Sequence, residues 1–345
     1  HFRETNKNGD LVGGPMYYIK NGLGPKWHWL AVLFSTFGVL TVFGTGNATQ
    51  VNTITTAINS ALENYQLIND QSKPVVCLVI GIVLAALVGL VLLGGVKRIG
   101  TVSEKLVPFM AAFYVLGCFV ILCINYDFII PAVTTICKLA FTPGAAAGGL
   151  VGRGIMMAMQ YGIARGLFSN ESGMGSAPIA AAAAQTNEPV AQGLVSMLGT
   201  IIDTVIICTM TGLSIVITGA WDMGLEGVSV TTKAFQMGLP FPEQVASFML
   251  MVCLVFFAFT TILGWNYYSE KCLEYLVGDK KAVLKGYRWL YILAVFIGPF
   301  MTVSAVWTIA DIFNGLMALP NLIALVALSG VVVAETKKYF EKQKY

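Results

Sequence analysis

Long apolar stretches dominate this sequence and restrict its fold more than any other feature. A membrane-crossing helix needs ~20 mostly apolar residues to span ~30 Å of hydrocarbon. Eight stretches meet that length, at 27–62, 74–94, 104–125, 149–185, 189–219, 244–276, 288–307 and 311–335. Of the 345 residues, 56% are hydrophobic and only 11% are charged, whereas soluble domains carry about 25% charged residues. We therefore predict an all-α polytopic membrane protein with eight spans.

The basic residues indicate how these spans are oriented. Lys and Arg gather in segments 1–26, 95–105, 270–288 and 336–345, and they are scarce in loops 63–73, 126–148 and 221–243. Short basic loops remain on the cytoplasmic side of a membrane. We therefore predict a cytoplasmic entry loop at 1–26, one transmembrane domain at 27–335 in the plasma membrane and a basic cytoplasmic tail at 336–345. The net charge of +3 is small and spread over these loops, which argues against a nucleic-acid partner.

One of the eight stretches, 149–185, is interrupted by the polar sequence "GLFSNESGMGSAP" at 166–178. Unpaired polar groups are costly in hydrocarbon, so an interruption at membrane depth needs a partner or a purpose. A helix that ends near Gly166 would leave its last carbonyl groups free for an ammonium group. Broken spans of this kind point to a transporter binding site. We predict a break at 167–173 with a substrate site at Gly166, Phe168, Ser169 and Asn170. The alternative is a kinked helix whose free backbone groups form hydrogen bonds with neighbouring helices.

Two adjacent threonines, Thr260 and Thr261, lie in the middle of the apolar stretch 244–276. Their hydroxyl groups could bind a hard cation together with backbone carbonyls from another helix. Alternatively, each hydroxyl bonds back to its own helix, as is common for threonine in apolar helices. Trp265 follows about one turn later and could line the same cavity or lie at the membrane interface.

Three further sets of polar groups occur in apolar surroundings. Asn47 and Gln50 in "FGTGNATQVN" could bind substrate or a neighbouring helix. Asp203 in "GTIIDTVIICTMTG" is a single acid that either couples transport to an ion or pairs with a polar neighbour. Glu171 in the break also needs a partner, because an unpaired acidic side chain at the centre of a membrane costs ~3 kcal/mol or more.

The sequence lacks the signatures of other classes of membrane protein. An intramembrane enzyme would need a nucleophile with a base, or metal ligands, yet the sequence has two histidines and seven scattered cysteines without metal-binding spacing. A channel would normally show repeated pore loops or rings of like charge. We therefore expect a transporter without catalytic residues.

Four segments together resemble the alanine or glycine:cation symporters of the amino acid–polyamine–cation superfamily. The segments are "GDLVGGPMYYI", "GLFSNESGMGSAPIAAAAA", "GTIIDTVIICTMTGL" and "FAFTTILGWNYYSEK", and the similarity extends from about residue 9 to residue 335. The resemblance implies sodium- or proton-coupled import of alanine and glycine. It also implies the leucine-transporter-like fold, in which ten core helices form two inverted repeats and the first and sixth are unwound.

On this resemblance, the eight spans are core helices three to ten, and the break is the unwound part of the sixth. Thr260 and Thr261 then match the eighth-helix half of a sodium site. The family's first unwound helix, which supplies the substrate-carboxylate site and the other half of the sodium shell, precedes the region matched here. The resemblance therefore implies a site of which this sequence carries one half, with sodium as the transported ion and the lipid bilayer as the surrounding medium.

The mechanism that follows is alternating access. The ammonium group of alanine would meet the carbonyls near Gly166–Ser169, Gln50 and Trp265 would shape the pocket, and Phe168 would cover the methyl group. Coupling to protons through Glu171 or Asp203 stays open as the alternative to coupling to sodium.

Overall fold

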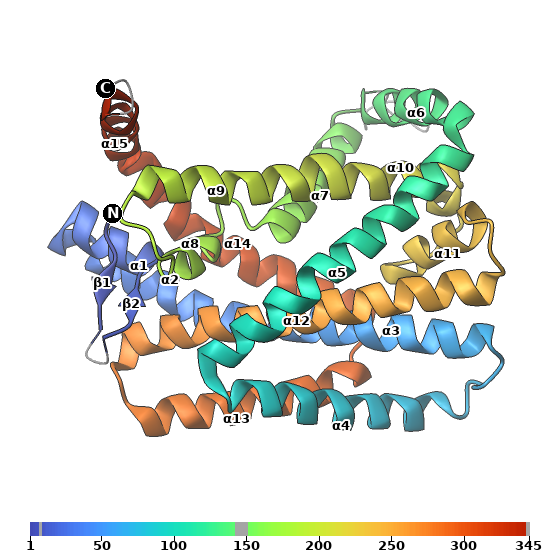
Figure 1. Ribbon diagram of the computed structural model, residues 1–345, viewed down its shortest axis with the longest axis horizontal. Helices are drawn as coiled ribbons and strands as arrows, with labels where there is room; N and C mark the ends of the chain where they lie inside the picture. The colour runs from blue at the N-terminus through green and yellow to red at the C-terminus, as the bar shows by residue number, and fades with distance from the viewer. Residues whose placement is uncertain (7–8, 142–150, 343–345) are drawn as a thin grey trace.

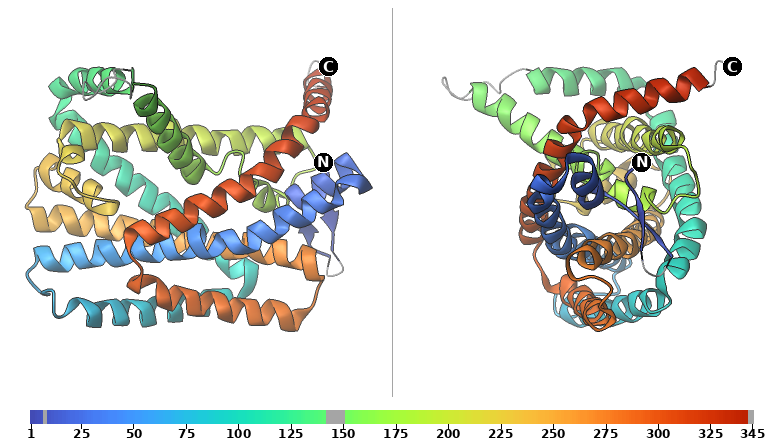
Figure 2. Two further views of the ribbon diagram at one scale, coloured as in Figure 1. Left: turned by 180° about the vertical axis from the view of Figure 1, so that it is seen from behind. Right: turned by 90° about the vertical axis from the view of Figure 1, so that its left-hand side faces the viewer.

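The structure is a computed structural model that describes residues 1–6, 9–141 and 151–342. Most of these residues are helical, and the longest helices run side by side along the long axis of the molecule (Figure 1). The chain begins with a short antiparallel hairpin, in which Glu4 pairs with Val12 and Thr5 with Leu11. Both described ends of the chain lie at the same end of the helical bundle (Figures 1 and 2).

The elements are mainly α-helices, which range from four to 35 residues in length. Two strands come first, β1 (Glu4–Thr5) and β2 (Leu11–Val12). The first half then contains α1 (Pro15–Tyr18), α2 (His28–Thr41), α3 (Thr49–Asn64), α4 (Lys73–Leu92), α5 (Gly95–Ile124), α6 (Ile129–Phe141) and α7 (Val151–Asn170). The second half contains α8 (Ala177–Ala181), α9 (Pro189–Ile201), α10 (Thr209–Ile217), α11 (Val228–Gly238), α12 (Glu243–Val277), α13 (Lys281–Ile297), α14 (Val303–Ala327) and α15 (Ser329–Lys342).

Two π-helical segments of seven residues each lie inside long helical stretches. The first, η3 (Val42–Ala48), joins α2 to α3, and the second, η5 (Ile202–Cys208), joins α9 to α10. A π-helical segment locally widens a helix and is frequent at functional sites. The sequence "FGTGNATQVN" at 43–52 therefore does not interrupt its span, because η3 keeps the chain helical.

The core of the molecule is built around α12 and the continuous stretch α2–η3–α3. Its main cluster includes Phe34, Ile54, Trp265 and Tyr291, all of which are buried. In the most apolar part of segment 25–64, 56% of the residues are buried. The helices α4 and α13 form a layer on one side of this pair (Figure 1).

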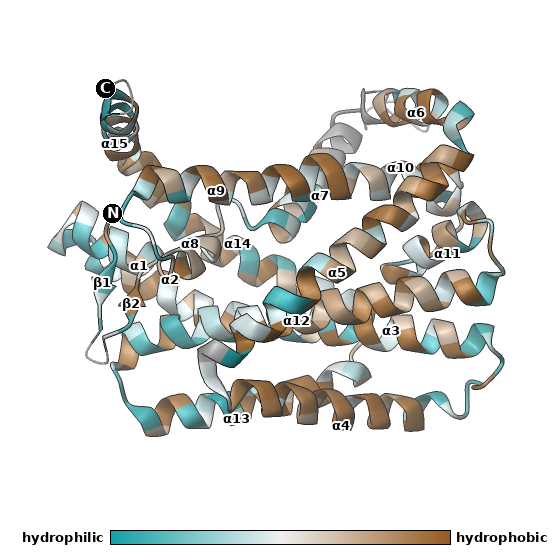
Figure 3. Cartoon of the chain, in the orientation of Figure 1, coloured by the Kyte–Doolittle hydropathy of each residue, from teal (hydrophilic) through white to brown (hydrophobic). Residues whose placement is uncertain are grey.

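The stretch α9–η5–α10 is exposed by contrast. Only 6% of its most apolar part is buried, although its hydropathy is that of a membrane span. Apolar surface of this kind also runs along α4 and α5 (Figure 3). Surface that would be costly in water is stable against lipid tails, which fits a chain that lies in a membrane.

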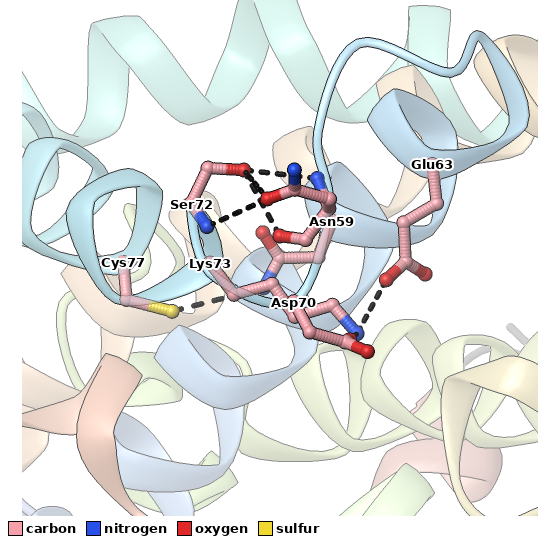
Figure 4. A network of polar contacts seen from close by, with 7 residues as sticks. Asn59, Glu63, Asp70, Ser72, Lys73 and Cys77 are labelled. Atoms are coloured by element: carbon pink, nitrogen blue, oxygen red, sulfur yellow. Dashed lines mark hydrogen bonds and ion pairs between the residues drawn. The ribbon is translucent and has the colours of Figure 1, made fainter.

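Polar residues fix the short connection between α3 and α4. The Lys73 ammonium lies 2.5 Å from a Glu63 oxygen and 2.9 Å from an Asp70 oxygen. The Ser72 hydroxyl donates to the Asn69 carbonyl, and the Asn59 amide donates to the Cys77 sulfur across the two helices (Figure 4). These contacts hold the ends of two antiparallel helices together where the connection leaves the apolar bundle.

Seven helices in the described residues are long and apolar enough to cross a membrane. The eight predicted spans differ from these seven in the stretch 149–185, where the helix stops at Asn170. The last two predicted spans also begin and end at other residues than we predicted. Gly298 and Pro299 form a short 3-10 turn after α13, and the Thr302 hydroxyl then caps α14 by accepting from the Ala305 amide. Proline ends a helix because it lacks an N–H group, so the boundary falls near residue 301 and not near residue 309.

Candidate functional site

The break follows α7 directly and extends from Glu171 to Ser176. Glu171, Gly173 and Gly175 have φ angles of 55°, 83° and 93°, which a right-handed helix cannot contain. The helix therefore ends at Asn170 and not near Gly166, and the second half-helix, α8, begins at Ala177 and not near Gly173. The carbonyl groups of Phe168, Ser169 and Asn170 lie at the C-terminal end of α7, where the helix carries partial negative charge.

Three side-chain contacts join this break to the π-helical stretch η5 and the turn before it. The Ser169 hydroxyl donates to an Asp203 oxygen at 2.7 Å, and the Asn170 amide donates to the Thr204 hydroxyl at 2.9 Å. The hydroxyl groups of Ser172 and Thr200 lie 3.3 Å apart. Asp203 therefore has a polar neighbour, which is one of the two roles that its sequence context allowed.

Glu171 has a hydrogen-bond partner within the break. The Ser176 hydroxyl donates to its carboxylate at 2.6 Å. A donor of this kind lowers the cost of an acid inside a membrane protein. Trp265 is 3% exposed.

Trp265 in turn packs closely against η3. A Cβ atom added at Gly46 would lie 2.2 Å from the Cβ atom of Trp265, so only glycine fits there. The Tyr291 hydroxyl contacts the carbonyl oxygens of Gly46 and Ile262 at 3.0 and 2.8 Å. The Asn47 amide donates to the Tyr291 carbonyl at 3.1 Å. Asn47 thus contacts a neighbouring helix, while the Gln50 amide donates to the Thr45 carbonyl of its own helix at 3.1 Å.

The threonine pair in α12 bonds back to its own helix. The Thr260 hydroxyl lies 3.0 Å from the carbonyls of Phe256 and Phe257, and the Thr261 hydroxyl lies 2.8 Å from the Phe257 carbonyl. A hydroxyl that donates to a carbonyl retains its own oxygen lone pairs as cation ligands. Among the described residues, there is no group of three or more His, Cys, Asp or Glu that could hold a metal ion.

A further cluster lies at the preceding turn of α7 and contacts α14. The Phe168 and Trp307 rings lie 4.8 Å apart between centroids. The Arg165 guanidinium lies 4.3 Å from the centre of the Trp307 ring and forms two hydrogen bonds to the Asp311 carboxylate, at 2.8 and 2.9 Å. Phe168 therefore covers an aromatic and ionic contact between two helices.

On its other side, the break is tied to the N-terminal segment. The Asn321 amide of α14 donates to the Gly173 carbonyl at 2.8 Å. The Tyr18 hydroxyl, from the end of α1, donates to the Asn321 side-chain oxygen. One buried asparagine thus connects α1, α14 and the break.

Two cavities lie on either side of this region. An open cavity of about 930 Å³ extends from the residues near both termini to the break, where Asn170, Glu171, Thr200 and Asn321 line it. A smaller cavity of about 220 Å³ lies toward the opposite end of the molecule, under the start of α11, and is lined by Thr53, Thr231 and Trp307 among others. The contacts of Phe168 and Arg165 with Trp307 lie between the two.

The structure brings together some of the residues that the sequence singled out. Ser169 and Asn170 contact η5 through Asp203 and Thr204, Glu171 contacts Ser176 within the break, and Trp265 packs against Gly46 of η3. Gly166 lies within the last turns of α7, so its carbonyl is not at the helix end. The sequence reasoning missed their partners, namely Arg165, Ser176, Thr200, Thr204, Trp307, Asp311 and Asn321. A polar residue in an apolar stretch was the available signal for most of them.

A sequence comparison identifies the class of protein to which this site belongs. The sequence profile of the sodium:alanine symporter family matches residues 1–345. The chain belongs to the sodium:alanine symporter family. An uncharacterized transporter of Haemophilus influenzae is 52% identical over 345 residues, which cover 99% of this chain and 72% of the relative. The sodium/alanine symporter AgcS of Methanococcus maripaludis is 44% identical over 349 residues, 99% of this chain and 72% of the relative.

A third relative shows how substrates vary among similar proteins. It is named "Probable sodium/glutamine symporter GlnT" of Bacillus subtilis and is 34% identical over 333 residues, 96% of this chain and 65% of the relative. Members of the sodium:alanine symporter family are transporters and not enzymes, which confirms our expectation of a transporter. This chain is therefore a multi-pass membrane protein of a family of cation-coupled amino-acid symporters.

Proposed function

We propose that this member of the sodium:alanine symporter family imports small neutral amino acids, alanine and glycine, together with sodium by alternating access. The observation that carries the proposal is the break at 171–176, which an open cavity reaches from one end of the molecule. A break at that position exposes backbone groups to the cavity, where they can bind a charged ligand. The name of the relative AgcS supports alanine and sodium as the substrates.

The ammonium group of the amino acid would bind at the C-terminal end of α7. Carbonyl oxygens of Phe168, Ser169 and Asn170 lie there, and the Asp203 carboxylate is held 2.7 Å from the Ser169 hydroxyl. Both features favour a positive charge. Phe168 would cover a methyl side chain, and Trp265 with Gln50 would limit the size of the pocket. A larger side chain would then be rejected by steric overlap.

Sodium would bind to the oxygens of Thr260 and Thr261 together with backbone carbonyls. Both hydroxyl oxygens lie on α12, one turn before Trp265, and retain lone pairs for a cation. Sodium entering down a membrane potential of ~100 mV (negative inside) contributes about 2.3 kcal/mol, and a tenfold concentration ratio adds about 1.4 kcal/mol. Together these support accumulation of the amino acid by a few hundredfold, on the order of 10².

Alternating access would require the contacts on the far side of the break to open while the large cavity closes. Arg165, Phe168, Trp307 and Asp311 form those contacts between α7 and α14. We assign the spans to core helices three to ten of the leucine-transporter-like inverted repeat. We place both ends of the chain on the cytoplasmic side of the plasma membrane, because the basic loops alternate along the sequence.

The test is alanine uptake by the full-length protein in proteoliposomes. Uptake is driven first by an inward sodium gradient and then by a pH gradient in a buffer that contains potassium in place of sodium. Thr260→Ala should lower the apparent sodium affinity by about tenfold or more, since one cation ligand is lost. Thr260→Ser keeps the hydroxyl group and should stay near the native value. Phe168→Ala should weaken alanine uptake without changing the sodium dependence.

Proton coupling is the second candidate, because the cavity reaches Glu171 and because Ser169 links Asp203 to the same break. Uptake that follows the pH gradient and survives Thr260→Ala would move coupling to one of these carboxylates and would exclude the sodium site. Uptake that requires sodium and fails in Thr260→Ala would support the proposal. Absence of alanine uptake under either gradient, with uptake of another amino acid, would overturn the substrate assignment.

A further inference from the structure

The C-terminal helix α15 (Ser329–Lys342) differs from the other long helices in its direction and in its surroundings. It starts two residues after α14, and only Leu328 separates them. It extends sideways from the end of the bundle that holds both termini (Figure 2). None of its residues is buried. A helix in this position lies at the level where the preceding span ends, and so at a membrane surface.

One side of α15 attaches it to the rest of the chain through polar groups. A Glu335 oxygen lies 3.8 Å from the His1 ring nitrogen, and the Lys342 ammonium lies 3.6 Å from a Glu188 oxygen. Glu335, Lys338 and Lys342 also line the large cavity. Positions three and four apart share one face of a helix, so these three residues form a single polar strip.

The opposite side of α15 is apolar and points away from the protein. Val332, Val333 and Phe340 are 60%, 53% and 46% exposed. Thr336 lies on the same side, and its hydroxyl donates to the Val332 carbonyl at 2.8 Å, so its polar group is satisfied within the helix. The spacing of these four residues repeats with the helical period. This apolar strip consists of Val332, Val333, Thr336 and Phe340.

Lipid is the occupant that best fits the apolar strip. An amphipathic helix with apolar and basic faces lies in the plane of a membrane interface, and lysines next to a span end attract anionic headgroups. The segment 329–345 contains four lysines and two glutamates. The strip also continues the apolar surface of α14, whose residues Leu322, Leu325 and Val326 are exposed.

We propose that α15 is an interfacial helix that buries its apolar strip in the bilayer surface at the end of α14 and contacts anionic headgroups through its lysines. The helix would fix the level of the cavity entrance relative to the membrane, since its polar strip lines that cavity. This inference does not depend on the transported substrate or ion. Its failure would leave the proposed symport unchanged.

The experiment places a fluorescent label on single cysteines introduced at neighbouring exposed positions of the full-length protein. Val333→Cys and Phe340→Cys lie on the apolar strip, whereas Ala334→Cys and Glu341→Cys are their matched controls on other faces. The protein is reconstituted in phosphatidylcholine vesicles with and without phosphatidylglycerol. Protein without an introduced cysteine, labelled in parallel, gives the background from native cysteines.

Labels at 333 and 340 should be quenched by lipids brominated in the acyl chain and shielded from iodide in the water. Labels at 334 and 341 should show the reverse. The contrast should increase when phosphatidylglycerol is present. Equal iodide quenching at all four positions would overturn the proposal, because the helix would then lie in water. Shielding of positions 333 and 340 from both quenchers would also overturn it and would show that protein covers the strip.

Discussion

The π-helical segments η3 and η5 have the same length and opposite surroundings. Six of the seven residues of η3 are buried, from Val42 to Ala48, whereas η5 has none buried. In η3 the widened turn lets Trp265 approach Gly46 and lets the Tyr291 hydroxyl reach the backbone. In η5 it presents Asp203 and Thr204 to the break. The same local backbone thus serves as a buried scaffold in one place and as a polar surface facing the break in the other.

This difference suggests a division of the molecule into a rigid part and a more mobile part. The stretch α2–η3–α3 and α12 form a packed unit that holds its shape, while α7, the break and η5 are joined mainly by side-chain hydrogen bonds near open space. A part held by few buried contacts is expected to move more easily. Four substitutions test this division, beginning with the one that should have the largest effect.

Gly46→Ala should strongly destabilise the scaffold, because its new Cβ atom would lie 2.2 Å from Trp265. We expect a loss of about 3 kcal/mol, the upper end for overpacking a core. The measurement is the thermal unfolding of purified protein followed by size-exclusion chromatography. Gly199→Ala in α9 is the control, since its Cβ atom would meet nothing within 4 Å; alanine should stabilise that helix by up to about 1 kcal/mol. Equal effects of the two variants would contradict the division.

Tyr291→Phe removes a buried hydroxyl that contacts the Gly46 and Ile262 carbonyls. The loss of this donor should cost about 1–3 kcal/mol. The same thermal assay measures it, with Tyr126→Phe as control, because Tyr126 is 66% exposed and should change stability by less than about 0.5 kcal/mol. A Tyr291→Phe protein as stable as the native one would mean that η3 is held by packing alone.

Asp203→Asn tests the open segment η5 and should act on transport more than on folding. Loss of the negative charge beside Ser169 should lower alanine uptake by about tenfold, or about 1.4 kcal/mol. The thermal unfolding temperature should hardly change, because η5 has no buried residue. Asp222→Asn, outside η5, is the control for a lost surface carboxylate. Unfolding of Asp203→Asn at a clearly lower temperature with intact uptake would assign Asp203 a structural role.

The ion pair between Arg165 and Asp311 should have only a small effect on stability. Its side chains are 39% and 35% exposed, so the pair is expected to contribute less than about 1 kcal/mol. Reversing one charge with Arg165→Asp should make the small cavity under α11 more accessible to water-soluble thiol reagents at Thr231→Cys. The double variant Arg165→Asp with Asp311→Arg should restore protection. Unchanged labelling in the single variant would show that this contact does not control access.

Much of the broad description could be predicted from the sequence. The transporter class and the family follow from the apolar stretches and from motifs such as "GLFSNESGMGSAP", and the family is confirmed by the match over residues 1–345. The break could be placed because polar residues and glycines stand together in an apolar stretch, but its limits could not. The helix continues to Asn170 because nothing before Glu171 prevents it, and φ becomes positive only there.

The partners of the break residues could not be predicted. Ser169 and Asp203 are 34 positions apart in the chain, and Arg165 and Asp311 are 146 apart. Periodicity within a helix shows which face a residue occupies, but it does not show which other helix that face meets. Thr260 and Thr261 are a further case, because their bonds to Phe256 and Phe257 were one of the two arrangements that the sequence allowed.

The sequence by itself determined that this chain belongs in a membrane, because enough apolar residues in a row exclude water whatever their partners. It also determined where one span cannot continue as a helix, because glycine and polar side chains act on the backbone locally. Only the tertiary structure decided that one π-helical segment is buried against Trp265 and Tyr291 while the other faces the break. Burial depends on contacts between distant helices, and those contacts form only when the whole bundle packs.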